Sequence, residues 1–478
     1  MNLRSESEAL VASSSQITGG WLVCPNCGAS YKTPHHFCSQ CHYYTSSWWA
    51  PEGLAKKRSR WKLQLILAVL VLLLIIYLAW TSPFVPNPFV LFRQPASDWA
   101  SLSSPDEWTG YARDTAHTRY VPFLVSPLHG RIRWSLTLGE EPTESLPAVA
   151  DGVLYVGGYF KVLALEAATG KQIWQTETTG PVHSSPVIAD TLLFMGLLDG
   201  RIMALERSTG QLKWEYQTGN FIFSSPAVVN NILYIGSGDQ AIYALSAQTG
   251  ELIWKTMTEG RVQFAPALRD GVLYVSSSDR SLYSLGAKTG AQRLRFRTYR
   301  DLVDAPVVAN KLVYFVTREG RLYTIKHEAR EVPGQYPFKW IWMQLWLWRL
   351  PVPPPPPQAG AMWRTLPKHA WFGFTSSPAV TPEALYLGDR RGWFYARDAL
   401  KGEPLWEFRA RSRIPAAPLV LGDTVYFGSV DGKLYALDRH KGKLLWKLSL
   451  GAPINTSPVY AAGLLFQRTE DGKIHAIE

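Results

Sequence analysis

Cysteine is scarce in this chain. The 478 residues contain four cysteines, and all of them lie within the first 41 positions. Disulfide bonds therefore cannot stabilise the long remainder, whose folding must depend on the burial of apolar side chains. Apolar residues make up 46% of the sequence, which is ample for a large core.

The excess of basic over acidic residues is modest, and long apolar runs are scarce. The net charge of +11 is modest for this length, and five of the basic residues fall within one short run, Lys56–Lys62. The rest of the chain shows no dominant basic face, which argues against a nucleic-acid partner. One uncharged apolar run of eighteen residues is present, at 63–80.

A repeat occupies most of the chain. Each unit opens on a proline, and successive prolines are 39, 40, 40, 40, 72, 40 and 40 residues apart. In the third unit, turn residues separate four short apolar segments at Ala227–Val229, Ile232–Gly236, Ala241–Leu245 and Leu252–Thr256. Four strands per unit at this period are typical of a β-propeller, so we predict an all-β fold of eight blades. The opening prolines are Pro147, Pro186, Pro226, Pro266, Pro306, Pro378, Pro418 and Pro458.

The eighth unit lacks its fourth strand, because the sequence stops at Ile477-Glu478. A segment with the missing pattern, Gly130–Leu136, precedes the first unit. We expect this N-terminal strand to pair with the last blade and close the ring, which removes an exposed sheet edge.

A tryptophan follows most Thr-Gly or Lys-Gly turns by four residues. A large ring on an outer strand can pack on the turn glycine of the neighbouring blade, and its N–H can find a backbone acceptor. We interpret these residues as structural blade-docking residues, with Phe296 taking the corresponding place in blade four. They are Trp134, Trp174, Trp214, Trp254, Trp406 and Trp446.

The repeat resembles that of pyrroloquinoline-quinone (PQQ) propellers. Segments Ala164–Trp174 and Ala204–Trp214 share the pattern A-L-E-x-x-T-G-x-x-x-W, and Trp108–Thr118 is similar to the lead-in of that family. The resemblance covers residues 106–478 and implies the fold. It leaves the function open, because the family includes quinoprotein dehydrogenases and scaffolds that bind no quinone, such as the propeller lipoprotein of the outer-membrane β-barrel assembly machinery.

A PQQ enzyme would need oxygen ligands for Ca²⁺, a carboxylate base and cations for the quinone. The loops of blades four to seven are rich in arginine, and Trp371 is a candidate floor for a quinone. However, the propeller has no cysteine pair, and one unit alone exceeds 40 residues. We therefore expect no catalytic residues and no PQQ. The carboxylates to consider are Asp239, Asp279, Asp301, Asp304 and Asp389.

Blade five carries an insertion at about 328–361, in place of its Thr-Gly turn. It holds the run Phe338–Leu350, with four tryptophans, followed by the proline-rich Pro351–Pro357. Such composition favours a protein groove or the membrane interface, although the segment could also pack on the propeller. The candidate partner contacts are Trp340, Trp342, Trp346, Trp348, Arg390 and Arg391.

The four cysteines form two C-x-x-C pairs, Cys24/Cys27 and Cys38/Cys41. Two such knuckles can present four thiolates to Zn²⁺, and the segment 21–45 resembles a short zinc ribbon, with His42 where glycine is usual. Two disulfides or a redox pair are the alternatives. We expect structural zinc, whose binding would supply the folding energy of this small segment.

The apolar run at 63–80 is long enough for a transmembrane helix. A cleaved signal peptide fits less well, because a folded ribbon would precede it. The basic segment 46–62 places the N-terminus in the cytoplasm and the propeller outside it. Residues 1–20 are expected to be disordered, and 81–105 to form a proline-rich linker.

These observations predict a cell-membrane protein with one transmembrane helix, a cytoplasmic zinc ribbon and an extracytoplasmic propeller. We expect it to act as a protein-binding scaffold or assembly factor, with partners in or at the membrane. A PQQ-dependent dehydrogenase and a transmembrane ligand sensor are the alternative hypotheses.

Overall fold

The computed structural model describes residues 22–24, 26–31, 38–42, 65–73, 107–122, 128–139, 143–331, 335–355, 357–367 and 373–478. The chain divides into two compact units, Met1–Ala79 and Trp80–Glu478. The predicted segments 1–20, 46–62 and 81–105 lie outside the described residues.

The first unit contains a short antiparallel hairpin of β1 (Leu22–Val23) and β2 (Ser30–Tyr31). Residues 65–73, within the predicted transmembrane segment, are helical. Among the residues that the structure describes, no helix has the length and apolar character needed to cross a membrane.

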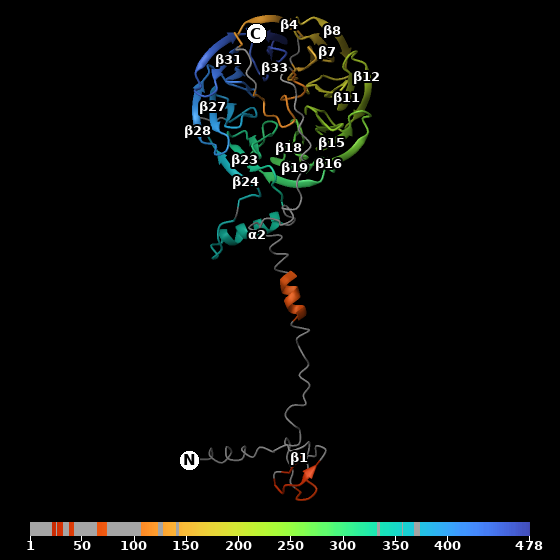
Figure 1. The fold of residues 1–478 in the computed structure, drawn as a ribbon, viewed down its shortest axis with the longest axis vertical. Coiled ribbons are helices and arrows are strands. Elements are labelled where there is room, and N and C mark those ends of the chain that lie inside the picture. The colour runs from red at the N-terminus through yellow and green to blue at the C-terminus, as the bar shows by residue number, and fades with distance from the viewer. Residues whose placement is uncertain are drawn as a thin grey trace. The chain divides into compact units, whose positions relative to one another are not determined.

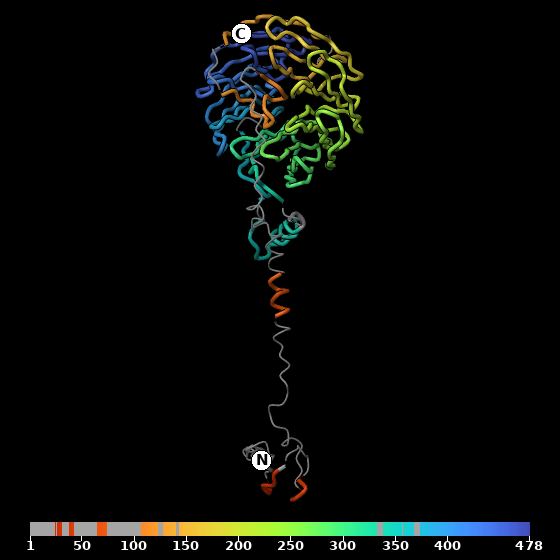
Figure 2. Tube along the Cα trace, turned by 45° about the vertical axis from the view of Figure 1, so that its right-hand side comes forward, coloured from red at the N-terminus to blue at the C-terminus, as the bar shows by residue number. Residues whose placement is uncertain are grey.

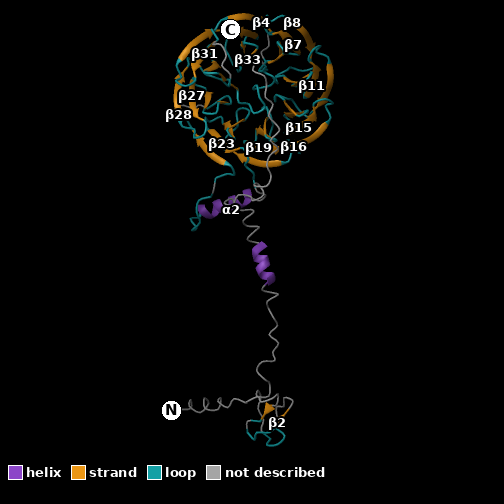
Figure 3. Cartoon of the chain, in the orientation of Figure 1, coloured by secondary structure: helices purple, strands orange, loops and turns teal. Residues whose placement is uncertain are grey.

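The second unit is an eight-bladed β-propeller, as predicted, and Figure 1 shows the blades arranged in a ring. Figure 3 shows that strands make up this ring, whereas α2 (Gln335–Leu347) is helical. Blades one to four consist of β5 (Ala148–Ala150), β6 (Val153–Gly158), β7 (Lys161–Glu166) and β8 (Gln172–Glu177); β9 (Val187–Ala189), β10 (Leu192–Gly196), β11 (Arg201–Glu206) and β12 (Leu212–Gln217); β13 (Ala227–Val229), β14 (Ile232–Gly236), β15 (Ala241–Ser246) and β16 (Leu252–Met257); and β17 (Ala267–Arg269), β18 (Val272–Ser277), β19 (Ser281–Gly286) and β20 (Gln292–Arg297).

The other blades follow the same antiparallel order. Blades five to eight consist of β21 (Val307–Ala309), β22 (Leu312–Val316), β23 (Leu322–Lys326) and β24 (Ala361–Thr365); β25 (Ala379–Val380), β26 (Ala384–Gly388), β27 (Trp393–Asp398) and β28 (Pro404–Arg409); β29 (Leu419–Leu421), β30 (Thr424–Gly428), β31 (Lys433–Asp438) and β32 (Leu444–Ser449); and β33 (Val459–Ala461), β34 (Leu464–Arg468), β35 (Lys473–Ile477) and β4 (Ile132–Thr137).

The N-terminal strand closes the ring, which confirms the prediction. Strand β4 pairs with β35, for example through Ile474↔Leu136 and Ala476↔Trp134. The first and last parts of the propeller therefore lie side by side in Figures 1 and 2. Further inside, Arg468 of blade eight donates to the carbonyls of Ser145 (2.8 Å) and Gly157 (2.9 Å) of blade one. Both contacts join the two ends of the repeat array.

Tryptophans link most blades to the next. The indole N–H of Trp174 donates to the carbonyl of Arg207 at 2.9 Å, and its ring covers Gly210 in the turn of the following blade. The same bond joins Trp134 to Ala167, Trp214 to Ala247, Trp254 to Ala287, Trp406 to Arg439 and Trp446 to Leu128.

Two details of the docking pattern differ from the sequence prediction. Leu294, rather than Phe296, occupies the position of the docking tryptophan in blade four, because it pairs with Ser284 as Trp254 pairs with Ala244. In blade five, Trp363 packs on Gly402 and is the docking residue that the prediction missed.

The lead-in segment forms a collar inside the ring. Residues 108–121 bond to the innermost strands of six blades, from Trp108 paired with Val149 in blade one to β3 (Tyr120–Val121) beside β29 in blade seven. Between these ends, Thr109, Thr115, Ala116 and Thr118 each accept a backbone N–H from blades two, four, five and six respectively. The collar follows the ring because Arg113, His117 and Arg119 adopt left-handed backbone angles (φ 76°, 64° and 52°).

The docking interface predicts a difference between two glycines. A Cβ at Gly250 (φ +75°) would lie 2.7 Å from the Trp214 ring, whereas at Gly152 (φ +71°) it would meet nothing within 4 Å. Both Gly→Ala changes carry the same backbone strain, so we expect Gly250→Ala to lower the free energy of unfolding by about 1–3 kcal/mol more than Gly152→Ala. Urea unfolding measures this difference, and equal losses would contradict tight docking.

Candidate functional site

A cavity of about 610 Å³ lies on the axis of the propeller. Its walls come from the segments that enter the innermost strand of each blade, together with Tyr111 of the collar. The polar lining residues include Glu144, His183, Asp304 and Arg413. This cavity is where a ligand of the propeller would bind if it used the central channel.

Asp304 is the carboxylate of the sequence prediction that reaches this cavity, and it is engaged in structural contacts. Its oxygens accept hydrogen bonds from the Tyr111 hydroxyl (2.8 Å) and from the Ser377 N–H and hydroxyl (both 2.7 Å). Burial raises the pKa of the Tyr111 hydroxyl, which therefore remains a donor. The interaction fixes the collar to blades five and six.

Two basic side chains of the collar are buried beside Tyr111. The Arg119 guanidinium lies 4.9 Å from the Tyr111 ring centroid, and its terminal nitrogens make no hydrogen bond within the described part of the chain. His117 contacts the Pro306 carbonyl through Nδ1 at 3.0 Å. Burial, with the nearby Arg119 charge, lowers the pKa of His117 to about 4, so this histidine is neutral at physiological pH.

Three other predicted carboxylates form hydrogen bonds or ion pairs that stabilise loops of the propeller. Asp239 accepts from the Tyr243 hydroxyl, and Asp389 from the Tyr395 hydroxyl at 2.8 Å, each within its own blade. Burial raises the pKa of Asp239, but hydrogen bonds to this carboxylate, including the one from Tyr243, lower its pKa overall. Asp301 lies 3.5 Å from the nearest nitrogen of Arg280 and 3.9 Å from that of Arg318. None of the three lines the central cavity.

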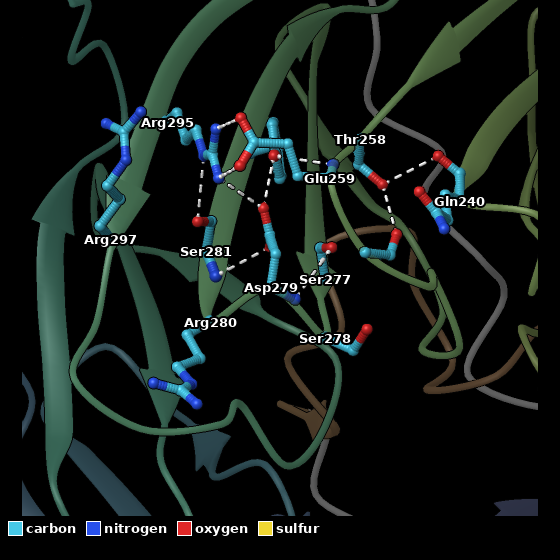
Figure 4. Close-up of polar contacts among 12 residues, drawn as sticks. Gln240, Thr258, Glu259, Ser277, Ser278, Asp279, Arg280, Ser281, Arg295 and Arg297 are labelled. Carbon is cyan, nitrogen blue, oxygen red and sulfur yellow. Dashed lines mark hydrogen bonds and ion pairs between the residues drawn. The ribbon is translucent and has the colours of Figure 1, made fainter.

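Asp279 belongs to a similar structural cluster. Figure 4 shows Arg295 in contact with Glu259, Asp279 and Ser281. The Arg295 guanidinium lies 2.8 Å from the Asp279 carboxylate. The hydrogen bond from Arg295 lowers the pKa of Glu259, and Asp279 also accepts from the Tyr283 hydroxyl at 2.6 Å. These contacts join blades three and four, so we assign Asp279 a structural role.

The arginine-rich loops divide into two groups. Arg280, Arg300, Arg318 and Arg321 each pair with Asp301 or Glu319. In contrast, Arg390, Arg411 and Arg413 are exposed, and within the described residues none forms an ion pair with a carboxylate. We call Arg390, Arg411 and Arg413 the arginine arc. Its two loops are neighbours, because the Ile414 N–H donates to the Asp389 carbonyl at 3.0 Å.

The four cysteines of the first unit converge. Their sulfur atoms all lie within 4.8 Å of one another, with Cys24–Cys41 at 3.7 Å and Cys27–Cys38 at 3.6 Å. No disulfide joins them. Four thiolates around Zn²⁺ at about 2.3 Å would be about 3.8 Å apart, so the arrangement fits a metal site. His42 adopts φ 57°, the angle that glycine usually supplies in this knuckle.

Comparison with known proteins assigns the propeller to a family. A family model described as outer membrane protein assembly factor BamB matches residues 121–222, 222–293, 266–356 and 346–478. The chain belongs to this family. The structure of BamB from Moraxella catarrhalis is similar with a TM-score of 0.58 and 16% identity, over 73% of this chain and 99% of that one.

Quinone enzymes share the fold. Quinohemoprotein alcohol dehydrogenase from Comamonas testosteroni is similar with a TM-score of 0.64 and 15% identity, over 83% of this chain and 82% of that one. In sequence, 119 residues are 29% identical to 1-butanol dehydrogenase (cytochrome c) from Thauera butanivorans, which covers 21% of this chain and 17% of that protein. The chain thus spans less than a fifth of this curated relative.

The cavity does not fit PQQ well. Among its described lining residues, Arg413 is the one arginine or lysine, and Asp304 is already hydrogen-bonded to the collar. A quinone with several carboxylate groups would need further cations, and Glu144 is the one other carboxylate among these lining residues that could serve as a Ca²⁺ ligand or a base. Trp371, the predicted floor, lies outside the described residues.

The buried His117 predicts an acid-sensitive propeller. The unfolded chain takes up a proton near the usual histidine pKa of about 6.5, whereas the folded state resists it until about pH 4. The contribution of His117 to stability is therefore complete above the pKa that this histidine has in the unfolded chain, and it is lost as the pH falls below that value. Between about pH 7 and about pH 5, protonation linked to His117 should lower the free energy of unfolding by about 2 kcal/mol. We expect His117→Gln to remove this part of the pH dependence.

Urea unfolding at both pH values measures this effect. The control is His440→Gln, since this side chain is 60% exposed. If His117→Gln and His440→Gln had the same pH dependence, the collar histidine would not be buried in its neutral form.

The cysteine cluster predicts one metal ion per chain. We expect the purified full chain to contain one equivalent of zinc, and Cys38→Ser to lose it, because three ligands hold the ion far less tightly. Elemental analysis measures the content. The far-ultraviolet circular dichroism of the propeller should stay unchanged. Retention of zinc in Cys38→Ser, or no zinc in the parent protein, would refute the assignment.

Proposed function

We propose that this protein is a membrane-anchored scaffold that binds an acidic partner protein on its propeller. The arginine arc carries the proposal: exposed arginines on two adjacent loops lack a carboxylate partner within the described residues. An exposed cationic surface of this kind favours association with a surface of opposite charge. Membership of the assembly-factor family supports a binding role, and the carboxylates engaged in turns support it further.

The proposed location follows from the sequence. The apolar run 63–80 would anchor the chain, with the cysteine cluster as a cytoplasmic zinc ribbon and the propeller outside. The absence of cysteine after position 41 agrees with this orientation, because the cysteines lie on the reducing side. A quinoprotein dehydrogenase is the second candidate, which is supported by the similarity to quinohemoprotein alcohol dehydrogenase.

Charge reversal of the arginine arc tests the scaffold. We expect Arg390, Arg411 and Arg413→Glu together to reduce recovery of a stoichiometric partner from native membranes by about tenfold, because like charges would then face each other. Quantitative mass spectrometry of the purified full chain measures the recovery. The control reverses three exposed basic residues on outer strands or beside them, namely Arg131, Arg133 and Lys447.

The two variants carry the same change in net charge. Loss of the partner in the arc variant alone supports the proposal. Equal recovery from both variants, or no stoichiometric partner with the parent chain, contradicts it.

A further inference from the structure

The insertion in blade five forms a helix with apolar side chains around most of its circumference. In α2 the exposed residues Trp340, Ile341, Met343, Trp346 and Leu347 have between 36% and 56% of their surface accessible. Trp348, just after the helix, is 69% exposed. Soluble proteins rarely expose so many large apolar side chains in one short segment.

The inner side of the helix is already covered by the rest of the insertion. The Trp342 indole N–H donates to the Pro353 carbonyl at 2.8 Å, and the rings of Phe338 and Trp342 lie 5.8 Å apart. The proline-rich segment therefore contacts α2 at Trp342. Trp340 and Trp346 remain on the uncovered surface.

The two stems of the insertion are fixed to blade four. The Glu331 N–H donates to the Arg293 carbonyl at 2.8 Å, and the Gln358 amide bonds both the N–H (2.9 Å) and the carbonyl (2.6 Å) of Arg297. These bonds cover the edge of β20. Leu294 stands here in the position of the docking tryptophan.

The charge of this region has one sign. Residues 332–382 contain no aspartate or glutamate, while Lys339, Arg349, Arg364 and Lys368 are basic. Arg349 follows the exposed apolar surface of α2 and is itself exposed, whereas Lys339 is partly buried beside Glu331 and Gln358 of the stems. Exposed apolar residues and tryptophan followed by a cation match the boundary between acyl chains and anionic headgroups.

We propose that α2 inserts into the interface of an anionic lipid bilayer. The helix is about 20 Å long, too short to cross a hydrocarbon core of about 30 Å, so it would lie along the surface. A helix that docks in a protein groove keeps a polar face toward water, whereas the exposed residues described in α2 are all apolar. Packing on the propeller would bury residues that are exposed here.

The contact would attach the propeller to the membrane at a second point, in addition to the proposed anchor at 63–80. Because both stems are bonded to β20, α2 would place the seam of blades four and five next to the membrane. The arginine arc lies in blades six and seven, so a partner could still reach it. This inference does not depend on that partner.

Site-specific photo-crosslinking of the full chain in vesicles of phosphatidylethanolamine and phosphatidylglycerol tests the proposal. Benzoylphenylalanine replaces Trp340 or Trp346 in turn, which keeps an aromatic side chain at each site. The controls carry it at Ile253 or Leu445, which are 47% and 52% exposed on the outer strands of blades three and seven. Unchanged thermal unfolding shows that each variant is folded.

We expect lipid adducts at Trp340 and Trp346 and none at Ile253 or Leu445. Replacement of the exposed Arg349 by Gln should reduce the adducts about fivefold, because one cation near an anionic surface contributes about that factor to binding. Equal adducts at all four sites, or none in α2, would overturn the proposal.

The same variants in native membranes separate lipid from protein. Lipid adducts there support the inference, whereas protein adducts at both α2 sites would show that α2 docks on a partner instead. Because the vesicles contain no other protein, a failed arginine-arc experiment leaves the lipid result unchanged.

Discussion

The packing of a tryptophan on the turn glycine of the next blade is the interaction on which this structure depends. Each blade alone would leave both sheet faces exposed, and the docking contact joins the outer strand of most blades to the following blade. Blade eight completes the ring because β4 supplies both its missing strand and Trp134. Where the contact is lost, between blades four and five, the insertion stems replace it with Glu331 and Gln358. The insertion is thus bonded to the fold between blades four and five, where the docking tryptophan is absent.

The inner surface of the ring is held by the collar in a comparable way. Backbone bonds from residues 108–121 reach six blades, and Asp304 ties Tyr111 to Ser377. A carboxylate used in this manner is not available as a base or as a Ca²⁺ ligand. The same holds for Asp279 and Asp389, which accept tyrosine hydroxyls. These contacts assign structural roles to the three carboxylates.

Periodicity made the propeller predictable. The prolines and turn glycines recur every 40 residues, so the strands of the third unit, for example β13 and β14, have the predicted bounds. The predicted closing strand overlaps β4 for the same reason, since Gly130–Leu136 matches the repeat. The collar could not be predicted this way, because its bonds join segments far apart in sequence and its backbone follows no strand pattern. Leu294 was missed because it is not aromatic, although it follows Gly290 by four residues as Trp254 follows Gly250. Trp363 was missed because the insertion separates it from the preceding strand of its blade.

The central proposal is that the propeller binds a protein and holds no quinone. Isothermal titration of the purified full chain with PQQ and Ca²⁺ tests it most directly, followed by an assay of alcohol oxidation with an artificial electron acceptor. We expect no saturable heat and no oxidation, because the cavity offers Arg413 as its one described arginine or lysine and Asp304 is engaged by the collar. Stoichiometric binding of PQQ with turnover of an alcohol would contradict the claim and identify the protein as a dehydrogenase.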